Sequence, residues 1–276
     1  MAFENFIPTV WAAGIERDLE RALVYAEDCN RKYDGVVKQA GDSVRILGVA
    51  APTIYDTNDK DIVLNDAETP ADTSIVMPVR QIAYYNYKVG DIDEAQSKEN
   101  GIMEALSAET SHALASKMDA YIARQAAEKE AVKYSNTTVT LTADNILGEI
   151  DKAVQKLYEN DVNMGSKIVL TLAPWMYTLF RQAYTGIDTN NSNYLKNGKI
   201  AMYNGIQVKM SNNVYKDAKG VTHAMLRTEN AIAFVNPMTH VEAYRPEKGF
   251  ADAVKGFVLY DAKIVRPKEM IIMNVQ

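Results

Sequence analysis

The feature that most constrains this chain is a long stretch without proline, from Glu94 to about Glu130. Apolar residues recur along it at helical spacing and mark one face, at Ile102, Leu106, Leu114, Met118 and Ile122. A single helix over this stretch would be about 50 Å long, far longer than an average globular helix. Such a helix needs a partner along its length, so we expect the strands of a preceding hairpin and of the C-terminus to lie beside it.

An arm and a long hairpin are predicted before this helix. From Val10 to Tyr33, apolar residues recur among charged ones at intervals of three and four, a pattern typical of an amphipathic helix. Segments 43–49 and 74–87 have strand-like patterns, and the polar segment 52–72 separates them. A connection this long usually has an interaction role. We therefore expect a hairpin that protrudes from the body.

The second half of the chain alternates between strands and helices. The predicted strands are 137–141, 167–172, 206–210, 224–226 and 231–235, and the predicted helices are 143–160 and 175–184. Pro174 stands where a helix can begin. This order indicates a compact α+β subdomain with helices packed on a small sheet. After it, the C-terminal residues predict extended strands broken at Pro246, Gly249, Gly256 and Pro267.

Composition argues against several classes of protein. The chain has 30 basic and 36 acidic residues and a formal net charge of -6, so it lacks the positive field with which proteins grip nucleic acid. Its single cysteine, Cys29, excludes an internal disulfide framework and fits a reducing cytosol. We find no signal peptide, and no run reaches the roughly 18 to 20 apolar residues that a spanning helix requires. No membrane partner is expected.

Motifs that would carry chemistry are missing. The three histidines, His112, His223 and His240, have no metal-binding spacing, and Cys29 reads as a small buried hydrophobe. There is no nucleophile elbow, Walker loop or dinucleotide fingerprint. The acidic run from Asp56 to Glu68 lacks the ligand spacing of a calcium-binding loop, and we interpret it as a solvated hairpin tip. We therefore expect no catalytic residue, metal or cofactor, and no enzyme activity.

Several short segments, in this order, resemble one branch of the Hong Kong 97 type of phage major capsid protein. They are Pro8 to Trp11, Tyr33 to Gly35 followed by Gly41 to Val44, Val89 to Gln96, Gly205 to Val208 with Ser211 to Asn213, Glu242 to Glu247, and Gly256, Tyr260 and Val265 to Pro267. The resemblance covers nearly the whole chain. It implies an α+β Hong Kong 97 capsid fold with an N-terminal arm (1–41), an extended hairpin loop (42–90), a peripheral domain with a spine helix (91–132), an axial domain (133–235) and returning strands (236–276).

The resemblance also implies a role in a virion. The chain would self-assemble into hexamers and pentamers of an icosahedral shell that encloses double-stranded DNA without sequence-specific binding. Because no long charged N-terminal extension is present, we expect a separate scaffolding protein, together with a portal, and assembly in the host cytoplasm. The candidate contacts between subunits lie on the arm, the hairpin tip and the tyrosine-rich strand: Trp11, Ile15, Asp56, Lys60, Asp61, Asn65, Tyr84 and Tyr85.

Two other functions stay open at this point. An encapsulin-like nanocompartment would use the same fold to hold a cargo protein, and the content of purified particles would separate it from a phage shell. A soluble α+β enzyme could use a site made of carboxylates and tyrosines. A compact monomer with one deep pocket would favour the enzyme, whereas an extended arm and hairpin without partners in their own chain would oppose it.

Overall fold

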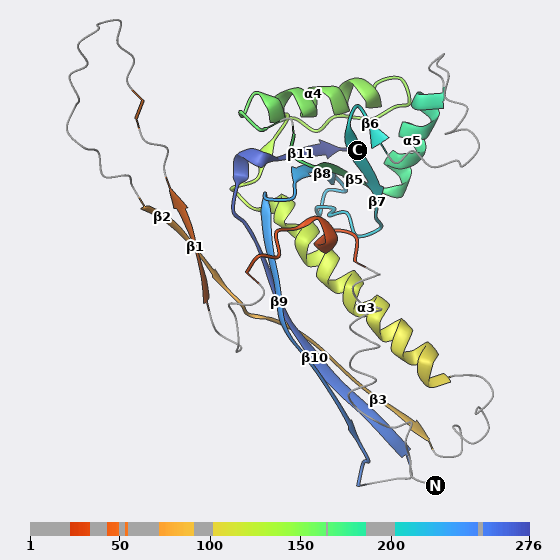
Figure 1. Ribbon diagram of the computed structural model, residues 1–276. Coiled ribbons are helices and arrows are strands. Elements are labelled where there is room, and N and C mark those ends of the chain that lie inside the picture. The colour runs from red at the N-terminus through yellow and green to blue at the C-terminus, as the bar shows by residue number, and fades with distance from the viewer. Residues whose placement is uncertain are drawn as a thin grey trace, which may run out of the picture.

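The computed structural model describes residues 23–33, 43–49, 53–54, 72–90, 102–163, 165–185, 202–247 and 251–276. They form an elongated part, in which a long helix lies beside three strands, and a compact part with a six-stranded sheet and two helices (Figure 1). The predicted α+β class is confirmed.

The long helix α3 spans Ile102–Arg124 and continues as a 3-10 turn, Gln125–Ala127. The predicted apolar face is confirmed at Leu114, Met118 and Ile122, which are all buried. The helical conformation ends before Glu130, where the prediction placed it, and the predicted first turns, 94–101, lie outside the described residues.

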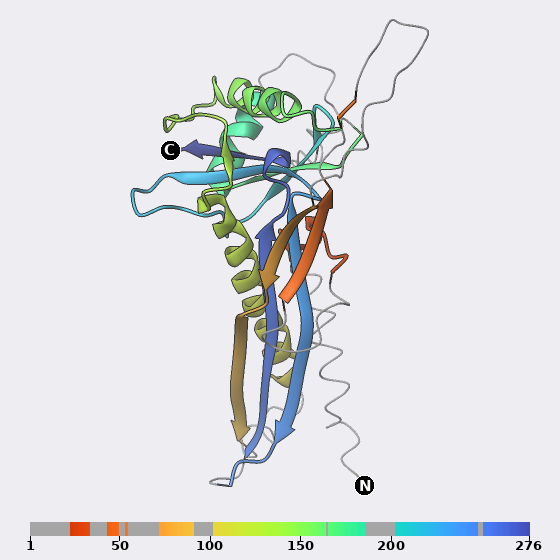
Figure 2. The same cartoon turned by 90° about the vertical axis from the view of Figure 1, so that its left-hand side faces the viewer.

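The partner of this helix is a three-stranded antiparallel sheet with the order β3-β10-β9. Its strands are β3 (Gln81–Gly90), β10 (Ala251–Ile264) and β9 (Ile232–Tyr244). Both views show α3 running beside these strands (Figures 1 and 2). Val258 of β10 is fully buried and belongs to the same apolar core as Leu114 and Met118 of the helix. The expectation that strands lie beside the long helix is confirmed for the C-terminal strands and for the later part of the predicted strand 74–87, whereas β1 and β2 form a separate sheet.

The predicted break at Gly256 is wrong, because β10 runs through it without interruption. Gly256 is paired with Tyr85 of β3, and a Cβ atom here would lie 2.6 Å from the carbonyl oxygen of His240. The glycine therefore permits close packing rather than a turn. Pro246 follows the end of β9 and Pro267 begins a 3-10 turn, as breaks would require, while Gly249 lies outside the described residues.

The predicted hairpin is confirmed as β1 (Ser43–Val49) paired antiparallel with β2 (Asp72–Pro78). The prediction of one strand over 74–87 is wrong, because the chain leaves this pair after Pro78 and enters the other sheet at Gln81. Between them Val79 is fully buried and the N–H of Arg80 donates to Asp261 rather than to a strand. A separate apolar core fixes the root of the hairpin to β9 and β10, and comprises Val44, Ile46, Met77, Val79, Ala233, Val235 and Leu259.

The compact part contains a mixed sheet with the order β4-β11-β8-β5-β7-β6. Its strands are β4 (Val132–Lys133), β5 (Ile168–Leu172), β6 (Met202–Tyr203), β7 (Ile206–Met210), β8 (Thr222–Thr228) and β11 (Met270–Val275). Every residue of β5, β8 and β11 is buried. Helix α4 (Ile146–Tyr158) lies on one side of this sheet and α3 on the other, which explains burial on both faces (Figures 1 and 2).

The second helix of the compact part, α5, spans Pro174–Thr185 and contacts α4. Its start at Pro174 was predicted, and β5 and β7 match their predicted segments to within a residue. The predicted strand 137–141 is reduced to one isolated bridge, between Val139 and Val275. Strand β6 was not predicted.

The predicted N-terminal helix is wrong over its described part. Residues 23–33 contain only a short 3-10 turn, Ala26–Asp28, and Asn30 then bridges to Ala233 of β9. An α-helix is excluded here because the backbone groups of this segment are bound by side chains of other elements. The remaining predicted turns, residues 10–22, lie outside the described residues.

Candidate assembly sites

The eight predicted contact residues are unevenly covered by the structure. Trp11, Ile15, Asp56, Lys60, Asp61 and Asn65 lie outside the described residues. Tyr84 and Tyr85 are neighbours on β3, so their side chains point to opposite faces of the sheet. Tyr84 is 82% exposed, whereas Tyr85 packs against the main core and lies across Gly256.

Tyr84 belongs to an apolar sheet face that points away from α3. Ile82, two residues before it on the edge strand, is 53% exposed. The register places Phe257 opposite Tyr84 and His240 opposite Phe257, and the last two rings are 5.6 Å apart. An exposed apolar surface on an edge strand is a candidate contact for another chain. We call these four residues the outer sheet face.

A polar group of residues borders the outer sheet face. Lys255 forms an ion pair of 3.1 Å with Glu242, and its ammonium group lies 5.0 Å from the centre of the Tyr244 ring. The hydroxyl of Tyr244 donates to Asn86 at 3.1 Å. These contacts link β3, β10 and β9 and order the border of the apolar surface.

The hairpin offers further exposed apolar side chains. Ile54, beyond the end of β1, is 86% exposed, and Val76 on β2 is 43% exposed. Lys263 of β10 donates to the carbonyl oxygen of Val76 at 3.0 Å, which ties the root of β2 to the body. The root of the hairpin is therefore bound to the body, while the side chains of Val76 and Ile54 remain exposed.

A single carboxylate organises the point at which the chain passes from β2 to β3. Asp261, which is buried, accepts from the N–H of Arg80 at 3.1 Å and from the hydroxyl of Tyr121 on α3 at 2.9 Å. An irregularity between Leu259 and Asp261 in β10 sets the direction of this side chain. Burial, and the Asp261 charge beside it, raise the pKa of Tyr121. We call residues 78–81 together with Asp261 the strand junction.

Residues 23–30, which we call the elbow, connect the N-terminal segment to the body. Asp119 of α3 is only 1% exposed and accepts from three successive backbone N–H groups: Val24 at 2.7 Å, Tyr25 at 3.0 Å and Ala26 at 3.3 Å. Burial raises the pKa of Asp119, although the three N–H groups and the nearby Arg227 oppose this effect. The carboxylate thus caps a turn that belongs to a distant segment.

Positive charges hold the other side of the elbow. Arg227 of β8, also 1% exposed, donates to the carbonyl oxygens of Tyr25, at 2.7 Å, and Asp28. The buried carboxylate of Asp28 pairs with Lys167 at 2.7 Å and with Lys209 at 2.6 Å. Burial alone would raise the pKa of Asp28, but the two ammonium groups outweigh it and hold the pKa below its ordinary value.

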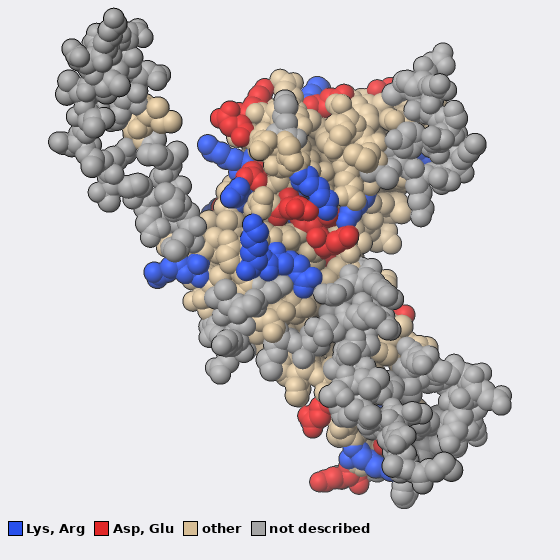
Figure 3. Space-filling view, in the orientation of Figure 1, with Lys and Arg blue, Asp and Glu red and all other residues tan. Residues whose placement is uncertain are grey.

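Acidic and basic groups gather on the surface where the compact and elongated parts meet (Figure 3). Two further pairs extend the network of the elbow outward, from Lys209 to Glu27 at 2.6 Å and from Lys167 to Glu229 at 3.1 Å. The network therefore runs from a buried centre to an exposed rim.

These contacts were missed at the level of sequence, although a signal was present. Asp119 falls directly after Met118, on the apolar side of the predicted helix, and Arg227 falls directly after Leu226 in an apolar strand. A charge at a core position is rarely buried without a partner. Such positions identify candidate buried contacts, but the pattern does not say which segment supplies the partners.

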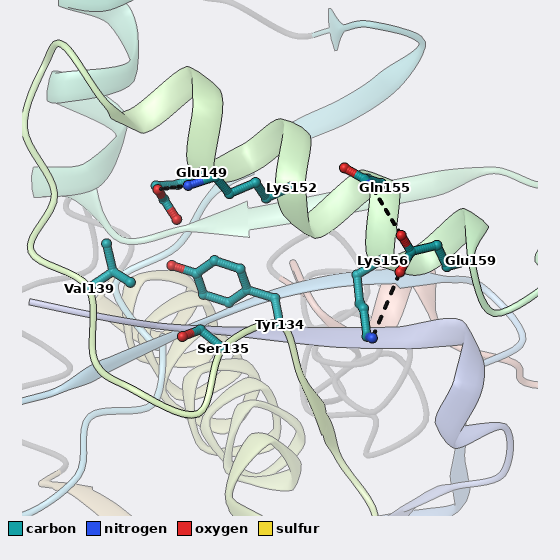
Figure 4. A pocket seen from close by; sticks show the side chains of 8 residues that line it. All are labelled: Tyr134, Ser135, Val139, Glu149, Lys152, Gln155, Lys156 and Glu159. Carbon is teal, nitrogen blue, oxygen red and sulfur yellow. Dashed lines mark hydrogen bonds and ion pairs between the residues drawn. The ribbon is translucent and has the colours of Figure 1, made fainter.

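An open groove of about 380 Å³ between α4 and the segment after β4 is the place to test the enzyme alternative (Figure 4). Its lining residues are Tyr134, Ser135, Val139, Glu149, Lys152, Gln155, Lys156 and Glu159. The charged groups are paired with one another along α4, with Lys152 2.7 Å from Glu149 and Lys156 3.8 Å from Glu159. Burial, with Glu149 beside it, raises the pKa of Tyr134, which makes this hydroxyl a poorer acid at neutral pH. The groove thus holds carboxylates and a tyrosine, and its charged side chains are paired along α4.

The cysteine and histidines also have structural surroundings. Cys29 is buried as predicted, its thiol donates to the carbonyl oxygen of Tyr25, and burial raises its pKa. His223 is buried on β8, with Nδ1 2.7 Å from Asn274 Oδ1. Among the described residues no group of three or more His, Cys, Asp or Glu side chains could hold a metal ion. Likewise, none of the helices described is long and apolar enough to span a membrane.

Comparison with known proteins gives matches in structure but not in sequence. No protein-family model and no curated protein matches the chain. A chain from Mycobacterium phage Che8 aligns with a TM-score of 0.74 and 25% identity, covering 91% of this chain and 90% of that one. The capsid of the cyanophage P-SCSP1u aligns with a TM-score of 0.68 and 16% identity, over 92% and 88% of the two chains.

A virus-like particle from Pyrococcus furiosus also aligns, with a TM-score of 0.60 and 12% identity, over 95% of this chain and 96% of that one. The matches extend over almost the whole length of each chain, so they concern the complete fold rather than one subdomain. The fold is that of phage capsid proteins, and the expected Hong Kong 97 type of fold is consistent with it.

Proposed function

We propose that this chain is the major capsid protein of a tailed phage, which self-assembles into hexamers and pentamers of an icosahedral shell around double-stranded DNA. The observation that carries the proposal is the alignment of nearly the entire chain with phage capsid structures. A shell subunit needs surfaces for several neighbours rather than one enclosed site. The exposed outer sheet face and the projecting hairpin are consistent with that need.

The five predicted regions fit this role as a working division of the chain. The arm (1–41) and the hairpin loop (42–90) would hold neighbouring subunits. The region 91–132, with α3, would be the spine of the peripheral domain, and 133–235 would form the axial domain near the centre of each capsomer. The returning strands (236–276) would complete both domains, because β10 belongs to the sheet of the elongated part and β11 to the sheet of the compact part.

Contacts between subunits would use the arm, the hairpin and the outer sheet face. Trp11, Ile15, Asp56, Lys60, Asp61 and Asn65 remain candidates on the arm and the hairpin tip. Tyr84 is the candidate best supported on β3, because 82% of it is exposed on an apolar face of an edge strand. Tyr85 would support that face from behind, since its ring packs within its own chain.

Several partners and absences follow from this role. A separate scaffolding protein and a portal would direct assembly in the host cytoplasm, and the virion capsid would be the final location. The net charge of -6 suits a container that must release its DNA, and DNA would be enclosed without sequence-specific contacts. The protein would act without a cofactor and without catalysis, which is consistent with the paired charges of the groove beside α4.

The test is electron microscopy with sedimentation of the purified protein, expressed with and without its neighbouring genes. We expect closed shells, tubes, or rings of five or six subunits. A monodisperse monomer at high concentration under both conditions would reject the proposal and favour the enzyme alternative. Normal shells from the chain expressed alone would reject the separate scaffolding protein only.

The encapsulin-like nanocompartment is not favoured over the phage shell, although a virus-like particle from Pyrococcus furiosus also aligns with the chain. The phage structures are preferred because the similarity to Che8 is higher, with a TM-score of 0.74 against 0.60. Nuclease-protected DNA of genome length in particles from the native source would support the phage shell. A cargo protein in place of DNA would support the nanocompartment.

A further inference from the structure

Several elements of its own chain bind the elbow. Asp119 binds it from α3 and Arg227 from β8. Strand β9 binds it through two backbone hydrogen bonds, from the N–H of Asn30 to Ile232 at 2.9 Å and from the N–H of Phe234 to Asn30 at 3.0 Å. No neighbouring subunit is needed for any of these contacts.

Apolar burial adds to the polar contacts. Leu23, Tyr25, Ala26 and Cys29 all belong to the main core, and Tyr25 and Ala26 are each only 1% exposed. The guanidinium of Arg227 lies 6.0 Å from the centre of the Tyr25 ring. The elbow is thus a part of the folded body rather than the first residues of a loose extension.

Burying a charged side chain costs free energy, and this cost explains why the elbow follows a specific path. Asp119 and Arg227 are both almost fully buried, and a buried ion without partners is strongly unfavourable. Their hydrogen-bond partners include backbone groups of the elbow, whose short 3-10 turn binds the N–H groups of Asp28 and Cys29 but not those of residues 24–26. The observed path of the chain presents three N–H groups to the carboxylate and two carbonyl oxygens to the guanidinium, and so supplies partners to both charges.

We propose that the elbow fixes the position and direction in which the N-terminal segment leaves the body in the isolated subunit, before any neighbour is bound, with Asp119 as the positioning residue. This inference deepens the proposed function and rests on it where the arm is said to grip neighbours. A shell of regular geometry requires each arm to start from the same place in each subunit, and the elbow provides that constant starting point.

The test compares Asp119→Ala with the conservative variant Asp119→Asn by amide hydrogen exchange in isolated subunits. In the wild type we expect the N–H groups of Val24, Tyr25 and Ala26 to be protected. In Asp119→Ala their exchange should be about 10- to 100-fold faster, because charge-assisted hydrogen bonds are lost. Asp119→Asn should be intermediate, because its one carbonyl oxygen can still accept from Tyr25 and Ala26.

The matched control is Asn274→Ala, which removes the buried contact with His223 at 2.7 Å and leaves the elbow unaltered. Denaturant titration measures the free energy of unfolding of each variant, so that assembly can be compared at equal global stability. In this comparison Asp119→Ala should give irregular or open assemblies in place of closed shells, and Asn274→Ala should give normal shells. A merely structural role of Asp119 would produce the same assembly result in both variants.

Either of two results would overturn the inference. One is unprotected amides at Val24 to Ala26 in the wild-type subunit, and the other is normal shells in normal yield from Asp119→Ala. The hydrogen-exchange measurement tests the inference about the elbow whether or not shells form. Absence of any assembly from the wild-type chain would therefore count against the proposed function and would leave the elbow to be decided by exchange.

Discussion

The ring of Tyr85 lies across Gly256 on the neighbouring strand, so close that a Cβ atom on residue 256 would come within 2.5 Å of the tyrosine hydroxyl oxygen. The same atom would lie 2.6 Å from the backbone carbonyl oxygen of His240 on the third strand. An aromatic residue that covers a glycine on the adjacent strand supplies the packing that the glycine lacks. This contact lets β10 remain straight at a position where the sequence predicts a break.

Gly256→Ala is expected to lower the free energy of unfolding by about 1 to 3 kcal/mol, because the added methyl group overpacks this site. Chemical denaturation of the isolated subunit would measure the change. The control is Gly148→Ala, since a Cβ at residue 148 in α4 meets nothing within 4 Å and should be neutral or stabilising by up to about 1 kcal/mol.

The Tyr85→Ala, Gly256→Ala double variant tests the origin of that loss. Removal of the ring relieves only the side-chain contact, because the His240 carbonyl is part of the backbone. We expect the double variant to be less destabilised than the sum of the two single variants, yet less stable than the wild type. Strict additivity would show that Tyr85 and Gly256 do not interact.

The buried ion pairs of Asp28 predict a pH dependence of stability. Its pKa is lowered in the folded state, so the folded chain binds this proton less tightly than the unfolded chain and acid favours unfolding. Asp28→Asn should be less stable than the wild type at neutral pH, by about 1.5 to 3 kcal/mol. The difference should shrink as the pH falls below the ordinary carboxyl range of about 4 and through the lowered pKa.

Unfolding measured from neutral to acidic pH checks this expectation, with Asp144→Asn as the control because Asp144 is exposed in the loop before α4. A stability difference between Asp28→Asn and the wild type that stays constant down to the acid limit would refute the linkage. A stability difference that increases as the pH falls would also refute it, because the linkage predicts a decrease.

Tyr84→Ser and Ile82→Ser separate assembly from folding. Both side chains are more than half exposed, so each change should alter the free energy of unfolding by no more than about 0.5 kcal/mol. Assembly should nevertheless fall, because the outer sheet face would lose its apolar contact. Light scattering and sedimentation of shells would measure this effect, and Ala108→Ser on the exposed side of α3 would serve as control. Normal assembly of both serine variants would remove this face from the candidate contacts.

Asp261→Ala should destabilise the subunit by about 1 to 3 kcal/mol, because two partly buried donors, the Arg80 N–H and the Tyr121 hydroxyl, lose their acceptor. A double-mutant cycle with Tyr121→Phe tests the contact directly. Tyr121→Phe should cost less in the Asp261→Ala background than in the wild type. Equal costs in both backgrounds would indicate that the two side chains are not coupled.

The local elements were largely predictable because they depend on local physics. Pro174 cannot donate a backbone hydrogen bond and has a helix-compatible φ, so it marks the start of α5. The alternation in 206–210 corresponds to β7, and the spacing of Leu114, Met118 and Ile122 corresponds to the buried face of α3. Each of these signals lies within a few residues of the element that it predicts.

The errors arise where tertiary contacts override local pattern. Segment 74–87 reads as one strand, yet Arg80 is bound by a carboxylate that lies far away in the sequence, and the chain changes sheets there. Segment 23–33 has helical spacing, yet Asp119 and Arg227 take its backbone groups. The candidate contacts between subunits could be predicted only as exposed or projecting residues, because the partner surface is not encoded locally.

The strand junction has a mechanical consequence. The segment that follows the hairpin strand β2, the long helix α3 and strand β10 all meet at the carboxylate of Asp261, through Arg80 and Tyr121. A force applied to the hairpin is therefore transmitted to both a helix and a sheet, within a few ångströms of the point where the hairpin joins the body. Tension applied at the periphery of a subunit would be spread along the full length of its stiffest elements, so the hairpin would act as a tether with a reinforced attachment rather than as a flexible tail.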